Sequence, residues 1–244
     1  MSVTVHDAQP GVRHIVIDRP TKKNALDSAT YSALTRALRE ADADGTVRAI
    51  VLSGAGGNFS SGNDLADFLA APNIDPAVGL LRALATIDTP LVAAVDGFAV
   101  GIGTTILLHC DLAAASRSAT FALPFVPLGL TPEGGSSVLL PEIAGTKLAN
   151  ELLLLGDRFD VDIAQRAGII NRIVDADDAV PAAIELATRL AVQPREALLA
   201  ARRLLRGDRE HLLDVIDAEV EVFVERLASS ETRDILDALQ NRKR

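Results

Sequence analysis

Glu133 is a carboxylate, a residue type that can take and return a proton. It lies in a glycine-bearing run, residues 128–137, and a carboxylate held there can act as a general base. The same run also fits an ordinary helix start, with Thr131 as N-cap, Pro132 at the first helical position and an acid in the first turn. By itself, the pattern favours a helix-dipole role for Glu133 over a catalytic one.

A glycine-bearing loop at residues 57–65 could hold negative charge through its backbone. It follows the β-branched run 49–53, and glycine permits geometries that direct an N–H into a cleft rather than into a strand ladder. The alternative is an ordinary loop in which Asn63 or Asp64 caps a short helix toward Leu69. Taken alone, the loop favours that alternative.

A second glycine loop, at residues 96–103, precedes an apolar stretch that is expected to be helical. The first N–H groups of a helix have no partner inside it, and the helix dipole favours negative charge there. Close packing of a strand against a helix would explain the same glycines. The loop is not a dinucleotide fingerprint, because Gly101 and Gly103 are followed by Ile106 where the third glycine should fall.

Other sequence motifs for catalysis or metal binding are missing. The chain holds neither a P-loop Gly-Lys-Ser/Thr nor a Gly-x-Ser-x-Gly elbow, and its four histidines lack ligand spacing, so no metal is expected. Cys110 is the single cysteine, which excludes an internal disulfide. Its apolar neighbours Leu107 and Leu108 predict a buried small hydrophobe rather than a nucleophile.

The composition is that of a folded, acidic protein. Of 244 residues, 48% are hydrophobic and 23% charged, which argues against disorder. The formal net charge of −9, with no dense Lys/Arg run, argues against nucleic-acid binding but leaves an anionic cofactor possible. No apolar run reaches the roughly 18 residues of a membrane span, and no signal peptide is visible. We therefore expect a cytoplasmic protein without a membrane partner.

Hydrophobic periodicity predicts an α/β chain that ends in helices. Residues 3–6 and 13–17 are expected to form a hairpin, and Asp27 or Ser28 to cap a helix reaching about residue 43. Further elements are expected at these positions: strands at 49–53, 91–95 and 112–116, and helices at 77–87, 101–110, 194–205, 210–227 and 230–240.

The C-terminal helices follow the last expected strand without a low-complexity linker. We therefore divide one domain into a core, residues 1–190, and a helical extension, residues 191–244. Within the extension one apolar stripe has helical spacing; its members are Leu212, Ile216, Val220, Phe223 and Leu227. The stripe fits either a cap on the same core or an interface between subunits, and the pattern alone does not choose between them.

Several stretches follow one another in the order of a known family's motifs. They are Arg19-Pro20 with Asn24-Ala25-Leu26, Phe59-Ser60-Ser61-Gly62-Asn63-Asp64-Leu65, residues 95–103, Leu155-Gly156-Asp157-Arg158, and residues 164–170. Together they resemble the crotonase, or enoyl-coenzyme A hydratase/isomerase, superfamily over nearly the whole chain. An ordered set of matches is far more specific than any single glycine loop.

The resemblance implies a crotonase-like α/β fold, a spiral of strand–strand–helix units forming two nearly perpendicular sheets. It also implies a helical C-terminal extension that assembles into homotrimers or hexamers. The oxyanion-hole donors would be the backbone N–H groups of Ser61 and Ile102. The family commonly has glycine at the second position, so the Ile102 side chain departs from the pattern and would narrow the cleft.

The reaction is indicated by where acidic residues are missing. Hydratases of the family use two glutamates to activate water, and the matching positions here are Thr105 and Phe125. Neither can hold a hydrating water, which disfavours hydration. The run around Glu133 resembles instead the peroxisomal-type Δ3,Δ2-enoyl-coenzyme A isomerases, whose single base is the glutamate of that Glu-Gly pair. This resemblance predicts an isomerase with Glu133 as its base.

The resemblance also predicts the substrate contacts. Coenzyme A would arrive as part of the acyl substrate, so no separate cofactor is expected. Arg242 lies near a basic C-terminal position of the family, although a solvated surface charge is favoured for it. The expected substrate-binding residues are Lys22, Lys23, Ala25, Ser60, Ser61, Gly62, Asn63, Asp64, Leu65, Gly101, Ile102 and Phe125. Weak hydration, thioester hydrolysis and non-catalytic acyl-coenzyme A binding are the alternatives.

Overall fold

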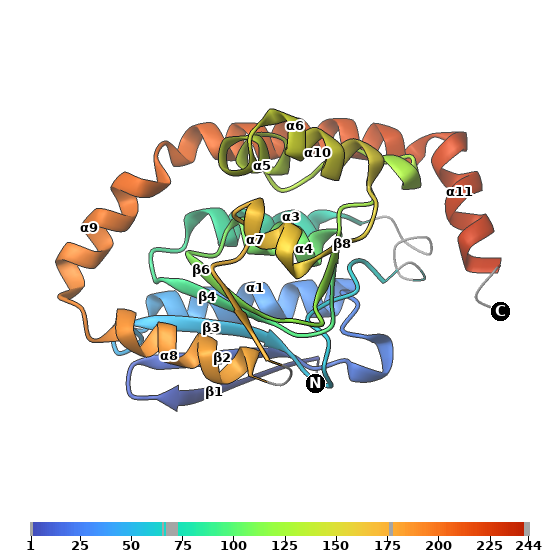
Figure 1. Cartoon of the computed structure of the whole chain (residues 1–244). Helices are drawn as coiled ribbons and strands as arrows, with labels where there is room; N and C mark the ends of the chain where they lie inside the picture. Colours follow the sequence, from blue (N-terminus) through green and yellow to red (C-terminus); the bar gives the residue numbers. More distant parts are fainter. Residues whose placement is uncertain (1, 65, 67–72, 176–177, 242–244) are drawn as a thin grey trace.

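The chain begins with the expected hairpin. A computed structural model describes residues 2–64, 66, 73–175 and 178–241 (Figure 1). Strands β1 (Val3–Gln9) and β2 (Val12–Ile17) pair in antiparallel register. The turn between them contains Gly11 at φ +76°, a left-handed conformation that glycine adopts without strain.

Helix α1 (Ser28–Ala43) confirms the predicted N-cap. The Asp27 side chain accepts a hydrogen bond from the Thr30 N–H at 2.8 Å, which satisfies one of the unpaired donors at the helix start. Tyr31, Leu34 and Leu38 form the buried face. This face packs on the main core, so the stripe seen in the sequence is what holds α1 in place.

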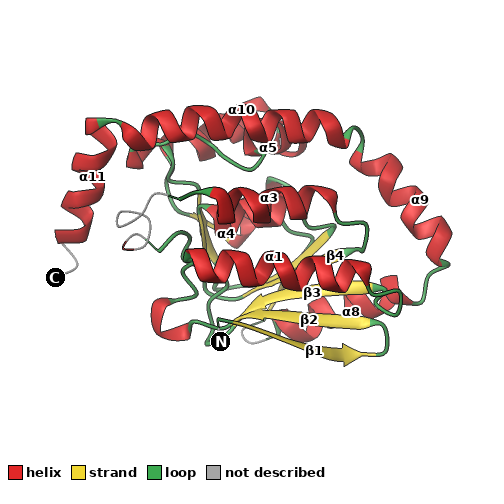
Figure 2. Cartoon of the chain, turned by 180° about the vertical axis from the view of Figure 1, so that it is seen from behind, coloured by secondary structure: helices red, strands yellow, loops and turns green. Residues whose placement is uncertain are grey.

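The largest sheet has six strands in the order β1-β2-β3-β4-β6-β9, and every pair after the hairpin is parallel. Helices cover both faces: α1 and α3 (Asp75–Thr86) on one side, α8 (Ala179–Ala191) on the other (Figure 2). Burial on both faces explains why the central strands are apolar throughout. The strands that follow the hairpin are β3 (Ala49–Gly54), β4 (Leu91–Val95), β6 (Leu112–Ser116) and β9 (Arg172–Val174).

A second sheet has three short strands, β5 (Phe98–Val100), β7 (Thr120–Ala122) and β8 (Phe159–Asp160). Helix α4 (Ile102–Leu108) begins directly after β5 and its turn. The two sheets and the repeated order of strands and helix agree with the expected spiral. The remaining elements that precede β9 in the chain are η1 (Pro20–Lys22), η2 (Val126–Leu128), α5 (Ser136–Ala144), α6 (Thr146–Asn150), η3 (Glu151–Leu155) and α7 (Val161–Arg166).

Three helices end the chain: α9 (Arg195–Arg206), α10 (Arg209–Ala228) and α11 (Ser230–Asn241). Figure 1 shows α9 arching from α8 up to α10, which lies across the helices of the core. In the described part of the chain no strand follows residue 190, as predicted. Among the described helices, none is long and apolar enough to cross a membrane.

The apolar stripe of α10 faces its own chain. Ile216 and Phe223 are buried in the main core, and Leu212, Val220 and Leu227 pack against the same core. Of the two readings of this stripe, the cap on the core is therefore the one observed. An interface between subunits would have to use other residues.

Helix α9 is anchored by a buried arginine. Arg202 Nε lies 2.8 Å from Asp111 Oδ1, and a second guanidinium nitrogen donates to the carbonyls of Ile87 and Asp88 at 2.7 and 3.0 Å. Asp111 also accepts a hydrogen bond from the Leu91 N–H at 2.8 Å. The ion pair thus ties α9 to the loops that precede β4 and β6.

Candidate active site

The two glycine loops, far apart in sequence, lie side by side. Ser60 N–H donates to the Phe98 carbonyl at 2.8 Å, and Val100 N–H donates to the Ser60 carbonyl at 3.0 Å. Gly103 is close to the same carbonyl, since a Cβ added there would lie 2.8 Å from Ser60 O. Close packing therefore explains this glycine, and the packing brings the two predicted oxyanion segments together.

Ile102 presents the backbone donor that the second loop predicts. Gly101 turns the chain at φ +55° and ψ −121°, and α4 begins at Ile102. The Ile102 N–H therefore has no acceptor within the helix, and no other described residue accepts from it. This donor, at the positive end of α4, is available to an oxyanion.

Ser61 differs from the prediction. Its backbone N–H donates to the Lys23 carbonyl at 3.0 Å, so it is not an unpaired donor in this structure. Lys23 itself adopts a left-handed backbone conformation with φ +51°. Sequence reasoning could not foresee this contact, because it depends on the conformation of a loop 38 residues earlier in the chain (61 − 23 = 38).

Glu133 lies in a loop and not in the first turn of a helix. Helix α5 begins only at Ser136, so the predicted helix start at Thr131 is wrong. Gly134 and Gly135 have φ values of +68° and +78°, and such left-handed residues interrupt a right-handed helix. Glu133 is therefore not a first-turn residue that interacts with a helix dipole.

The Glu133 carboxyl is buried and only partly satisfied. The residue is 9% exposed, and its Oε1 has no hydrogen-bond partner among the described residues. Burial raises the pKa of Glu133 to about 8; a hydrogen bond from the Thr105 side chain opposes the rise, and the charge of Glu219 adds to it. A buried carboxyl that lacks partners is costly, and such groups concentrate at functional sites.

Thr105 and Phe125, the positions that the resemblance matches to the hydratase glutamates, lie in the core. Thr105 is fully buried on α4, and a Cβ added at Gly134 would lie 2.6 Å from its Cγ2, so α4 touches the Glu133 loop. Phe125, which precedes η2, is 5% exposed and belongs to the main apolar core. Neither position therefore supplies Glu133 with a second carboxylate.

Asp64, another carboxylate of the expected substrate site, is engaged elsewhere. Its Oδ2 lies 3.1 Å from the Arg19 guanidinium, which also contacts Asp27 at 2.9 Å. Nearby, the Tyr31 hydroxyl donates to the Asn63 side chain. These contacts give Asp64 and Asn63 a structural role in holding the first loop to α1.

The cations expected to meet coenzyme A lie on the surface. The side chains of Lys22 and Lys23 are exposed, and Lys23 Nζ lies 5.0 Å from the centre of the Phe98 ring. The Arg158 guanidinium approaches the same ring at 5.9 Å. Arg158 belongs to one of the family motifs, but nothing in that motif indicated that its side chain would approach the same ring as Lys23. Ala25, Ser60 and Gly62 are buried, while Leu65 and Arg242 lie outside the described residues.

Two other predictions about reactive groups can be compared with the structure. Cys110 is partly buried rather than fully buried as predicted, and desolvation raises the pKa of its thiol, which disfavours the nucleophilic thiolate. Among the described residues, no group of three or more His, Cys, Asp or Glu could hold a metal ion.

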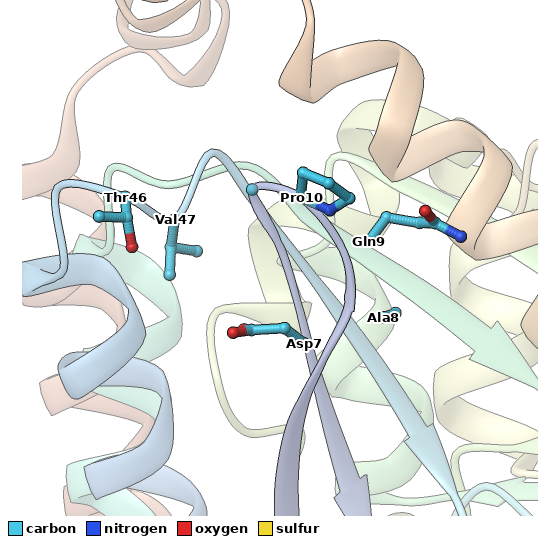
Figure 3. Close-up of a pocket in the computed structure, with 7 residues that line it drawn as sticks. Asp7, Ala8, Gln9, Pro10, Thr46 and Val47 are labelled. Carbon is cyan, nitrogen blue, oxygen red and sulfur yellow. The ribbon is translucent and has the colours of Figure 1, made fainter.

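A separate hollow lies at the β1–β2 hairpin (Figure 3). Its volume is about 360 Å³, and Gln9, Pro10, Thr46 and Val47 are among its walls. Its one carboxylate, Asp7, lies 2.6 Å from Arg13 Nε in an ion pair. With its acid already paired, this hollow offers no evident catalytic group.

Known proteins are similar to this chain in sequence and in fold. Residues 7–243 match the family model for enoyl-CoA hydratase/isomerase. A 1,2-epoxyphenylacetyl-CoA isomerase of Escherichia coli (strain K12) is 32% identical over 93% of this chain and 90% of its own. A 2,3-dehydroadipyl-CoA hydratase of the same strain is also 32% identical, over 96% and 93%.

Solved structures extend the comparison. An enoyl-CoA hydratase/isomerase from Pseudoalteromonas atlantica T6c has a TM-score of 0.94 at 36% identity, covering 99% of this chain and 98% of its own. An enoyl-CoA hydratase from Bacillus halodurans has a TM-score of 0.90 at 27% identity, covering 98% and 100%. The match over nearly the full length, together with the paired loops, shows that this chain belongs to the enoyl-CoA hydratase/isomerase family and has the crotonase fold.

Proposed function

We propose that this protein is an isomerase that moves the double bond of a 3-enoyl-coenzyme A thioester to the 2-trans position. The observation that carries the proposal is the buried Glu133 carboxyl, whose pKa burial raises to about 8. Thr105 and Phe125 stand where a hydratase would need carboxylates. A double-bond shift needs one base that takes and returns a proton, whereas hydration also needs a positioned water.

Glu133 would take a proton from C2, which the thioester carbonyl and the double bond make acidic. The electron pair of the broken C–H bond forms a dienolate whose negative charge lies on the thioester oxygen. The same carboxyl would then return the proton to C4, leaving the double bond between C2 and C3. Substrate and product are isomers, so no co-reactant is consumed.

The Ile102 N–H is the donor proposed for the thioester oxygen. A donor of this kind typically stabilises the transition state by about 2.7–4 kcal/mol. The Ser61 N–H would join it only if the oxyanion competes with the Lys23 carbonyl for this hydrogen bond. Because an anion is the stronger acceptor, we expect the exchange to occur as charge develops on the oxygen.

Exposed cations supply the proposed contacts to coenzyme A. Lys23 and Arg158 lie over Phe98, and Lys22 lies beside the first loop, where its carbonyl accepts a hydrogen bond from the Ser61 hydroxyl. The charges of these three side chains would attract the phosphates although the chain is acidic overall. Coenzyme A is then part of the substrate and not a separate cofactor.

Hydration is the second candidate, because relatives of similar identity include both an isomerase and hydratases. Those names place an isomerase of an epoxy thioester and hydratases in one family, so the acids at the site have to distinguish the reactions. In this chain, the missing carboxylates at 105 and 125 favour isomerisation.

A panel of thioesters tests the proposal. We expect turnover of 3-hexenoyl-coenzyme A to its 2-enoyl isomer, and no hydration of crotonyl-coenzyme A above about 1% of that rate. Absorbance of the conjugated thioester follows the first reaction, and chromatography of the 3-hydroxyacyl product follows the second. Efficient hydration with no isomerisation would reject the isomerase assignment.

A binding measurement accompanies the panel. Calorimetry with acetoacetyl-coenzyme A, which mimics the enolate, should show binding. Binding without turnover of any thioester would indicate a non-catalytic acyl-coenzyme A-binding protein. No binding at millimolar ligand would reject both functions.

We also expect a trimer or a multiple of three in solution. Because the α10 stripe packs against the core, an interface between subunits would have to use other apolar residues. Leu204 and Leu205 on α9 are candidates, since they are 85% and 88% exposed. Exposed apolar residues of this kind mark contact surfaces when they gather into a patch. Light scattering at micromolar concentration measures the mass, and Leu205→Glu should lower it. A monomer mass for the unaltered protein would contradict this expectation.

A further inference from the structure

The loop that carries Glu133 is held by two residues from other parts of the chain. Glu219 on α10 accepts hydrogen bonds from the backbone N–H groups of Gly135 at 2.6 Å and Ser137 at 3.0 Å, one through each carboxylate oxygen. Directly after α4, the His109 ring lies with Nε2 2.7 Å from the Gly134 carbonyl oxygen. A carbonyl only accepts, so Nε2 is the protonated nitrogen of this ring.

Two of these hydrogen bonds fix the two ends of one peptide unit. The Gly134 carbonyl and the Gly135 N–H belong to the same planar group and point in opposite directions. His109 holds one end and Glu219 the other. Consecutive glycines permit more backbone conformations than any other pair, so without these partners the peptide next to Glu133 would be free to flip.

Helix α5 also depends on Glu219. Its N-cap is Gly135, which has no side chain to accept hydrogen bonds from the first N–H groups. Glu219 supplies that cap from another helix, and its charge is favourable at the positive end of α5.

We propose that Glu219 is a positioning residue for the base Glu133, which acts with His109 to fix the Gly134–Gly135 peptide and hence the place of the Glu133 carboxyl. The inference rests on the proposed function of Glu133 but assigns Glu219 no contact with substrate. It gives α10 a role in the reaction as well as in the core.

Electrostatics agrees with this geometry. The charge of Glu219 adds to the rise in the pKa of Glu133, which burial dominates and the Thr105 hydrogen bond opposes. His109 contributes no charge near neutral pH, because burial and the nearby Arg206 together lower its pKa to about 4, although its hydrogen bond to Gly134 opposes the fall. Glu219 thus makes Glu133 a stronger base while it fixes its position.

The first measurement compares two neighbouring glutamates of α10. Glu219→Gln keeps the volume and removes the charge. Glu221→Gln makes the same change on an exposed residue of the same helix and is the matched control. We expect Glu219→Gln to lower kcat on 3-hexenoyl-coenzyme A at least about tenfold with KM within about twofold. Glu219→Ala should lower kcat about 100-fold, the effect of a misplacement on the order of 1 Å.

The second measurement needs no turnover. For each protein, the melting temperature is compared with that of its Glu133→Gln counterpart from pH 5 to pH 9. The pH at which this difference stops growing reports the pKa of Glu133. We expect that pH to fall in the Glu219→Gln background and to stay unchanged in the Glu221→Gln background.

The outcomes separate this inference from the proposed function. If the unaltered protein does not turn over 3-enoyl thioesters, the proposed function fails, and the pH measurement alone decides the role of Glu219. The inference is overturned if Glu219→Gln matches Glu221→Gln in kcat, or if its pH dependence is unchanged. Two variants test the role of His109: His109→Gln keeps a side-chain hydrogen-bond donor, whereas His109→Leu removes it. Equal kcat values for these two variants would overturn the positioning role of His109.

Discussion

Replacing Glu133 with glutamine is expected to lower kcat on 3-hexenoyl-coenzyme A by about 1000-fold, within the range of general-base catalysis. The change keeps the volume of the side chain and removes only its ability to take a proton. Binding of acetoacetyl-coenzyme A should stay within about threefold, since the oxyanion donors and the cations are untouched. Steady-state kinetics and calorimetry on the same preparation measure the two effects.

Glu142→Gln is the matched control, because Glu142 is an exposed glutamate of α5 and makes the same chemical change. Thr105 is not a neutral control, since its side chain hydrogen-bonds Glu133. If Glu133→Gln kept kcat within tenfold of the unaltered enzyme, about 1.4 kcal/mol in barrier, Glu133 would not be the base. Asp64 would then be the next carboxylate to replace.

Glu133→Gln should become more stable relative to the unaltered protein as the pH rises. The carboxyl has an ordinary pKa of 4.5 when exposed and a pKa of about 8 when buried in the folded protein. Between these values the unfolded chain is ionised there while the folded protein keeps the proton. Unfolding therefore releases a proton, and the stability of the unaltered protein falls as pH rises through this window. Glutamine lacks this effect, so the melting-temperature difference should grow from pH 5 to about pH 8.

Arg202→Met is expected to destabilise the fold by about 3 kcal/mol, the lower end for breaking a buried ion pair. Methionine keeps the length of the side chain but leaves Asp111 without its closest cation and leaves the carbonyls of Ile87 and Asp88 without their donor. Arg206, whose Nε is 3.4 Å from Asp111, keeps the effect from being larger. Thermal unfolding should show a melting temperature about 6–12 °C lower.

Arg203→Met tests the specificity of this effect, because Arg203 is an exposed residue next to Arg202 on the same helix. It should change stability by less than about 0.5 kcal/mol. Adding Asp111→Leu to Arg202→Met should recover part of the loss, since the carboxylate that lost its closest cation is then removed. Equal melting temperatures for the two single variants would show that the ion pair does not anchor α9.

The sequence predicted the elements whose determinants are local. Asp27 caps α1 as its residue type predicts, and the apolar runs became the parallel strands of the large sheet. The start of α5 was mispredicted because Thr131, Pro132 and Glu133 satisfy the preferences for a helix start. The two glycines after them take left-handed conformations, and nothing in those three residues reveals this.

The site was less predictable because its contacts join distant segments. The resemblance located both oxyanion loops, and the structure places them side by side. It did not show that the Lys23 carbonyl holds the Ser61 N–H, nor that Glu219 and His109 hold the peptide after Glu133. Such contacts depend on how α4, α10 and the loops pack, and no periodicity within one segment encodes them.

The distance along the chain between Gly135 and its partner Glu219 bears on how the protein is made. They are 84 residues apart, and at roughly 5–20 residues per second a ribosome needs on the order of 4–17 seconds to add that length. Throughout this interval the two glycines have emerged without their carboxylate partner. The Glu133 loop therefore reaches its final shape only after translation has passed α10, whatever order the strands follow.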